Sequence, residues 1–125
     1  MRTTVQQQIG LALLRIVPSL MMMTHGFPKL QKLLSGDFAF ADPIGIGQGP
    51  SLFLTVIGEF VAPLLIVLGF KTRFATVPAI ITMLVAAFVV HGEDPFGKKE
   101  LALIYATIFI VIGLLGPGRY SVDGK

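Results

Sequence analysis

Residues 74–90, FATVPAIITMLVAAFVV, contain no charged side chain. Thr76 and Thr82 are the only polar residues in this stretch. A helix built from it therefore has no polar stripe to present to water, as each helix of a soluble bundle must. The stretch is about as long as a helix that crosses the ~30 Å hydrocarbon core of a bilayer. It predicts a transmembrane helix.

The whole chain has the composition of a membrane protein. Of its 125 residues, 54% are hydrophobic and 14% are charged, whereas an ordinary soluble domain is about 25% charged. The apolar runs predict helices at about residues 9–27, 52–70, 74–91 and 99–116. We expect a single domain, residues 1–125, folded as an all-α integral membrane four-helix bundle. Arg15 splits the first run and no small-residue cleavage site follows it, so we interpret this run as a retained helix rather than a secretory signal.

The connections predict the topology. Residues 71–73 leave only a short turn between the second and third helices, which makes these helices antiparallel neighbours. An even number of crossings places both termini on one side, and the opposite side carries an outer loop at residues 31–51. Basic residues slightly favour the side of the termini, with Arg2, Lys71, Arg73, Arg119 and Lys125 against Lys29, Lys32, Lys98 and Lys99. The positive-inside rule then predicts cytoplasmic termini.

The residue content also argues against several classes of function. The chain has no cysteine, which excludes disulfides, thiolate metal sites and thiol chemistry by this chain. Its net charge is +3, but the basic residues lie at helix ends, where they suit anionic lipid headgroups rather than nucleic acid. Met21, Met22 and Met23 precede His25, yet consecutive helical residues point in different directions, so we expect no metal site.

Ionisable residues within the apolar runs define a candidate site. His25 ends the first helix and His91 the third, both at the outer level. Arg15 lies about 15 Å deeper than His25 on the same helix, and Glu59 lies about 10 Å below the outer end of the second helix. Charges at such depths usually face the bundle interior and pair. We therefore expect an ion pair between Arg15 and Glu59.

Two further side chains belong to this candidate site. Glu100 opens the fourth helix at the level of the histidines, and Tyr105 lies at the depth of Glu59, where it can donate a hydrogen bond to the carboxylate. The predicted ligand or proton-transfer pocket thus comprises Arg15, His25, Glu59, His91, Glu100 and Tyr105. Two interpretations stay open at this point. The pocket binds a ligand or transfers protons, or its charges only lock the helices together.

A series of short motifs resembles one family along nearly the whole chain. They are Leu14-Arg15-Ile16, His25-Gly26 with Lys29-Leu30, Gly58-Glu59, Leu68-Gly69-Phe70 with Thr72-Arg73, His91, Glu100-Leu101-Ala102-Leu103, and Gly116-Pro117-Gly118-Arg119-Tyr120-Ser121-Val122-Asp123. In this order they resemble the DoxX family of small bacterial membrane proteins. One departure is Gln31-Lys-Leu-Leu-Ser35, which stands where the family usually has a glycine-rich, aromatic segment.

The resemblance implies a four-helix protein of the bacterial cytoplasmic membrane. Family members are associated with thiosulfate:quinone oxidoreductase and other membrane redox systems. On this basis we expect an oxidoreductase subunit rather than an enzyme on its own, with no intrinsic cofactor, a quinone as ligand, and electrons supplied by a partner subunit or soluble donor. The alternatives are a non-catalytic membrane anchor or assembly subunit, and a small transporter. Small residues such as Gly10 and Ala12 would also permit a homo-oligomer.

Overall fold

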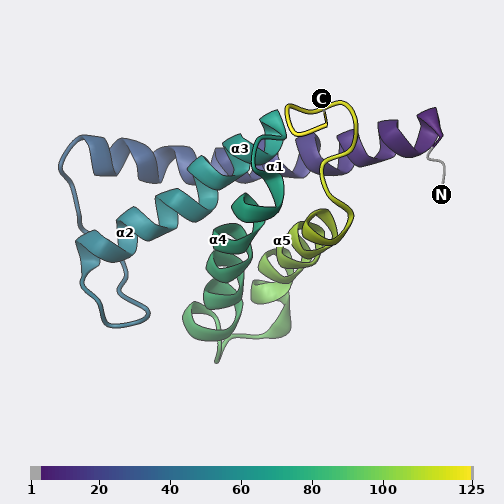
Figure 1. Cartoon of the computed structure of the whole chain (residues 1–125). Helices are drawn as coiled ribbons and strands as arrows, with labels where there is room; N and C mark the ends of the chain where they lie inside the picture. Colours follow the sequence, from purple (N-terminus) through teal and green to yellow (C-terminus); the bar gives the residue numbers. More distant parts are fainter. Residues whose placement is uncertain (1–3, 125) are drawn as a thin grey trace.

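The computed structural model describes residues 4–124, and within this range the chain forms helices joined by loops and turns, without a strand (Figure 1). Helix α1 spans Val5–Leu34. A second continuous rod consists of α2 (Gln48–Val56), the π-helical turn η1 (Ile57–Val61) and α3 (Ala62–Leu68). The predicted all-α fold class is confirmed for the described residues.

The second half of the chain forms a helical hairpin. Helix α4 (Thr72–Val85) continues into a second π-helical turn, η2 (Ala86–Val90), and α5 spans Phe96–Leu115. Three helices in the described range are long and apolar enough to cross a membrane, namely Val5–Leu34, Gln48–Leu68 and Thr72–Val90. Helix α5 carries three charged residues near its start. A fourth crossing and cytoplasmic termini remain predictions, and Arg2 and Lys125 lie outside the described residues.

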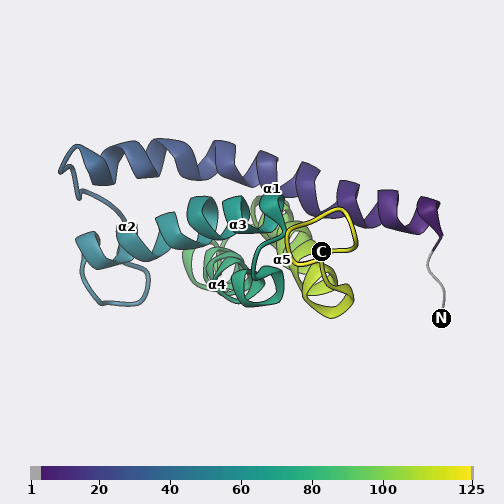
Figure 2. The ribbon, with the colours of Figure 1, turned by 45° about the horizontal axis from the view of Figure 1, so that its top comes forward.

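Residues 116–124 lie at the end of the bundle where α3 ends and α4 begins. Helix α1 runs beside the α2–η1–α3 rod, and the α4–α5 hairpin packs against this pair (Figures 1 and 2). We call the end that holds residues 116–124, the start of α4 and the end of α3 the termini end. The loop end holds residues 35–47, residues 91–95 and the end of α1.

Helix α1 is longer than the predicted residues 9–27. It begins at a capping box, in which Thr4 Oγ1 accepts from the Gln7 N–H and Gln7 Oε1 accepts from the Thr4 N–H. It continues through Pro28 to Leu34. Pro28 leaves the carbonyl of Thr24, four residues earlier, without its helical donor, and Thr24 is exposed. The connection to the second rod is correspondingly residues 35–47, shorter than the predicted loop at 31–51.

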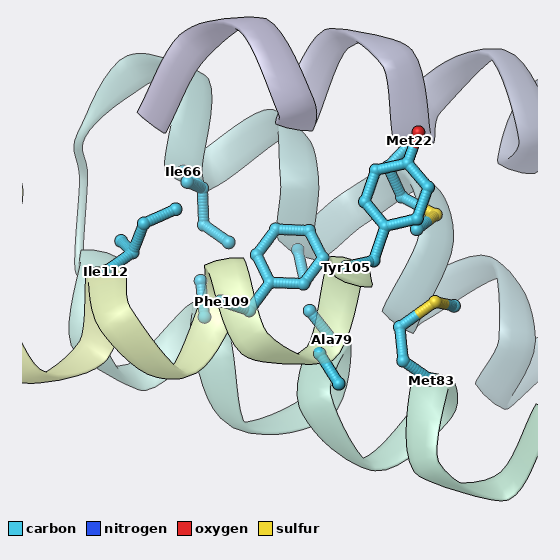
Figure 3. Packing of buried hydrophobic residues seen from close by; sticks show 10 residues of the cluster. Met22, Ile66, Ala79, Met83, Tyr105, Phe109 and Ile112 are labelled. Atoms are coloured by element: carbon cyan, nitrogen blue, oxygen red, sulfur yellow. The ribbon is translucent and has the colours of Figure 1, made fainter. Parts of the chain in front are cut away.

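The core lies where α4 and α5 meet α1 and α3 (Figure 3). Small residues let the helices approach closely, and buried Ala79 on α4 faces the bulky side chains of α5. Gly58 leaves no room for a side chain at its contact with α4, since an added Cβ would lie 1.9 Å from Thr82 Oγ1. The labelled core residues are Met22, Ile66, Ala79, Met83, Tyr105, Phe109 and Ile112.

Candidate functional site

A cavity of about 440 Å³ lies at the loop end of the bundle. It is lined by α1, the rod through η1, the end of α4 with η2, and the first turns of α5. Most of its walls are apolar, and Phe40 and Ile44 of the 35–47 loop close one side. Its ionisable side chains are His25, Lys29, Glu59, His91, Lys98 and Tyr105.

Lys29 and Glu59 form an ion pair at this cavity. The Glu59 side chain is 8% exposed and the Lys29 side chain 31%, so surrounding water screens the pair less than it would a pair on an open surface. The predicted pair between Arg15 and Glu59 is wrong. At 1.5 Å per residue, Arg15 lies about 21 Å from Lys29 along α1. The two basic residues therefore lie toward opposite ends of the bundle.

The local backbone explains how Glu59 reaches the cavity. Pro63 has no N–H to donate to the Glu59 carbonyl, and the hydrogen-bond ladder shifts so that the Ala62 N–H donates to the Ile57 carbonyl. The π-helical turn that results lies against Gly26 of α1, where an added Cβ would be 2.4 Å from the Glu59 carbonyl oxygen. Such turns often occur at functional sites. Glu59 is thereby placed directly beneath the turn of α1 that carries His25 and Lys29.

Tyr105 links the core to the cavity. Its ring makes an edge contact with the His25 ring at a centroid distance of 6.2 Å, and it stacks on Phe109 at 6.2 Å. Figure 3 shows the Tyr105 hydroxyl directed toward α1 beside Met22. The depth of Tyr105 allows either a hydrogen bond to Glu59 or ordinary packing, and in the described chain its ring packs against His25 and Phe109.

His91 ends the η2 turn at the mouth of the same cavity. Its Nδ1 lies 2.8 Å from Asp94 Oδ2, and this hydrogen bond holds the pKa of Asp94 below its usual range. The carboxylate fixes the orientation of the ring, as it does for other hydrogen-bonded histidines. His91 and Asp94 thus form a polar pair at the opening of an otherwise apolar space.

Asp42 holds the loop that covers this cavity. Its carboxylate accepts from the backbone N–H groups of Ile46 and Gly47, both at 2.9 Å, and from Ser51 Oγ at 3.0 Å. These bonds tie the loop to the first turn of α2. The loop is therefore a folded cover for the cavity rather than a loose connection.

The cavity gathers four of the six residues predicted for the pocket, namely His25, Glu59, His91 and Tyr105. Glu100 is exposed on the first turns of α5 and does not line it. Sequence reasoning missed Lys29, although Lys29 lies four residues after His25 and therefore on the same helical face. The four-residue spacing indicates that Lys29 shares a face with His25, but the first helix was predicted to end at residue 27, before Lys29.

Arg15 has a structural place at the termini end. It is 2% exposed, and its guanidinium donates to the carbonyls of Pro117, Tyr120 at 2.8 Å and Val67 at 3.4 Å. The first two carbonyls belong to residues 116–124, which we call the C-terminal segment. Arg15 therefore fastens this segment to α1 and α3.

Two more contacts complete this fastening. Gln8 Oε1 accepts from the Arg119 N–H at 2.7 Å. Asp123 accepts from the N–H groups of Lys71 at 2.9 Å and Thr72 at 2.8 Å, and thereby caps the start of α4. The hydrogen bond from Thr72 is the largest cause that lowers the pKa of Asp123. The C-terminal segment thus continues from α5 and is held to α1, α3 and α4 by hydrogen bonds. We call this set of contacts the C-terminal latch.

The apolar helices and the charges buried between them define a multi-pass helical membrane protein. The DoxX family model matches residues 10–92, which is more than half of the chain, and the chain belongs to the DoxX family. It is a multi-pass protein of the bacterial inner membrane.

Two curated proteins illustrate the relationship. The inner membrane protein YqjF of Escherichia coli K12 is 27% identical over 94% of this chain and 92% of its own length. An uncharacterised protein of Haemophilus influenzae is 31% identical over 92% of this chain and 89% of its own length. No solved structure matches the chain. The similarity extends over nearly the full length of both relatives.

Proposed function

We propose that this protein is the membrane component of a quinone-linked redox system, and that the loop-end cavity binds the quinone headgroup. The observation that carries the proposal is the Lys29–Glu59 ion pair at an otherwise mostly apolar cavity. Ionisable side chains within membrane-spanning helices are costly, and they usually mark a ligand site or a proton path.

The residues around the cavity fit a quinone. A quinone has two carbonyl oxygens that accept hydrogen bonds, on an apolar ring with an apolar tail. The Lys29 ammonium, the Tyr105 hydroxyl and a protonated ring nitrogen of His25 are donors at the cavity. Apolar side chains such as Leu54 and Val85 line the remaining space, which suits the ring and the start of the tail.

The same residues suit proton transfer. Reduction of a quinone to a quinol takes up two electrons and two protons. This chain has no cysteine thiol to supply electrons, so the electrons come from a partner subunit or a soluble donor. Glu59 and His25 are acid–base groups next to the proposed ligand site and can relay protons to it, and His91 at the cavity can exchange protons with water.

A binding titration tests the proposal. We would reconstitute the full chain in lipid nanodiscs and titrate a short-tailed quinone against the wild type, Glu59→Gln, His25→Ala and Glu100→Gln. Glu59→Gln removes the charged partner that positions the Lys29 ammonium at the cavity. Loss of a hydrogen bond from a charged donor is worth about 1.5–3 kcal/mol, so we expect this variant to weaken quinone binding about tenfold or more. Glu100→Gln is the matched control, because Glu100 does not line the cavity, and it should bind like the wild type.

Two results would count against the proposal. Equal affinity of all four proteins for the quinone would place the ligand elsewhere. Absence of quinone binding, together with a second polypeptide that leaves the membrane with this protein, would instead favour the anchor or assembly subunit, with the buried charges as structural elements.

A further inference from the structure

Two cavities at the termini end share a wall. The first, about 460 Å³, is bordered by Lys71, Arg73 and Asp123, and the second, about 320 Å³, by apolar side chains of η1, α3 and α4. Lys71 and Phe74 line both. The two cavities are therefore neighbours on either side of these two residues, and we call them together the groove, with a polar and an apolar part.

The polar part carries one net positive charge. Lys71 and Arg73 contribute two positive charges and Asp123 one negative charge. Both Asp123 oxygens already accept backbone N–H groups, from Lys71 and Thr72. Within residues 4–124, neither the Lys71 ammonium nor the Arg73 guanidinium has a hydrogen-bond or ion-pair partner, and the ammonium lies 5.7 Å over the ring of Phe70. Two cationic donors are thus left to bind an anion.

The backbone at Lys71 supports a use for its side chain. Lys71 has φ +50°, and it is the one non-glycine residue with positive φ in the described range. A glycine adopts this conformation without a steric cost, whereas most other residues do not. A lysine at such a position keeps a charged side chain at the groove in spite of the strain.

The apolar part extends from this charge into the membrane. The turn at Lys71 joins two candidate membrane spans, Gln48–Leu68 and Thr72–Val90, so it lies at the membrane surface. From Lys71 to Pro78 the groove follows α4 for about 10 Å, past Ala75 and opposite Val61 of η1. Its walls are therefore apolar where the bilayer is apolar.

We propose that this groove binds one anionic glycerophospholipid. The phosphodiester lies between Lys71 and Arg73, and the start of one acyl chain lies along Val61 and Pro78. The single net positive charge complements a phosphate group with one negative charge, and an overall anionic lipid is favoured over a zwitterionic one. The bound lipid then fastens the turn between α3 and α4, next to the C-terminal latch.

Native mass spectrometry of the full chain in detergent tests this site. We would titrate phosphatidylglycerol and, separately, phosphatidylcholine with the same acyl chains. The headgroup variant is Lys71→Asn/Arg73→Gln, because asparagine tolerates the positive φ. The acyl-chain variant is Val61→Phe, which fills the groove, and the control is Arg119→Gln, a basic residue of the C-terminal segment outside both cavities.

The expected results separate the two parts of the groove. Phosphatidylglycerol should bind at least fivefold more tightly than phosphatidylcholine, and the headgroup variant should remove this preference. Val61→Phe should weaken both lipids, and Arg119→Gln should change neither. Equal binding of the two lipids by the wild type would overturn the proposal. So would displacement of phosphatidylglycerol by millimolar inorganic phosphate with no effect of Val61→Phe, which would indicate a soluble phosphate ligand.

Discussion

Substitution of Arg15 by methionine should release the C-terminal segment. Methionine keeps an unbranched apolar stem but removes every donor of the guanidinium. Arg15 donates to the carbonyls of Pro117 and Tyr120, with a longer bond to Val67. The substitution therefore removes two good charge-assisted hydrogen bonds and leaves their acceptors without this donor.

The magnitude follows from two opposing terms. Hydrogen bonds to a charged group contribute about 1.5–3 kcal/mol each, so two of them contribute about 3–6 kcal/mol. Burial of the guanidinium, which is 2% exposed, costs part of this, because a charge removed from water loses its hydration. We expect a net loss of about 2–4 kcal/mol in the free energy of unfolding.

Two measurements test this predicted loss of stability in Arg15→Met. Thermal unfolding in detergent, monitored by helical circular dichroism, should show a lower midpoint. Limited trypsin digestion should cleave faster after Arg119, whose backbone N–H is held by Gln8 in the intact latch. Lys32→Met is the control, because its ion pair with Asp37 is exposed and such pairs contribute about 0–1 kcal/mol. An unchanged unfolding midpoint together with unchanged cleavage after Arg119 would refute the claim that Arg15 holds the C-terminal segment in place.

Two further predictions concern packing and pH. In the same thermal unfolding assay, Gly58→Ala should destabilise the fold by about 1–3 kcal/mol through overpacking, because the added Cβ would meet Thr82. Gly10→Ala is the control, because Gly10 has open space around it, and it should be neutral or slightly stabilising. The pKa of Asp123 is lowered in the folded protein, so its stabilising contribution is present above the unfolded pKa of about 3.9 and is lost as the pH falls through the folded value. The difference in unfolding midpoint between the wild type and Asp123→Asn should therefore shrink below about pH 4, and a difference that stays constant from pH 7 to pH 2 would contradict this account.

The sequence predicts the helices well because burial in lipid requires long apolar runs. The charge-free stretch at residues 74–90 lies within one helical rod of the structure, and the short turn near Lys71 joins two neighbouring helices. The predicted boundaries are less accurate, because the first helix, predicted at residues 9–27, spans Val5–Leu34 in the structure. Gly26 and Pro28 both lie inside α1, where the glycine allows close contact with η1 rather than a stop.

The partners of the buried charges were not predictable from helix depth alone. Arg15 and Glu59 have opposite charges on neighbouring rods, so a pair between them was the simplest expectation. The actual partners depend on contacts between distant parts of the chain. The C-terminal segment folds back to provide backbone carbonyls for Arg15, and the extension of α1 beyond Pro28 brings Lys29 to Glu59.

The charged residues between the helices fall into two groups in the structure, one at the termini end and one at the loop end. The termini end is fastened by Arg15 and Asp123 through hydrogen bonds to the backbone, which is a structural use of charge. At the loop end, by contrast, a partly buried ion pair borders a cavity large enough for a ligand. The structural interpretation of the charges therefore applies to Arg15, and the ligand-binding proposal rests on Glu59 and its neighbours.

The most direct test of the quinone proposal is native mass spectrometry of the protein, gently extracted from its own membrane. We predict a bound mass that matches a membrane quinone, retained in Glu100→Gln and lost or strongly reduced in Glu59→Gln. A quinone that stays bound in Glu59→Gln, or a wild-type protein that carries none, would contradict the assignment of the loop-end cavity.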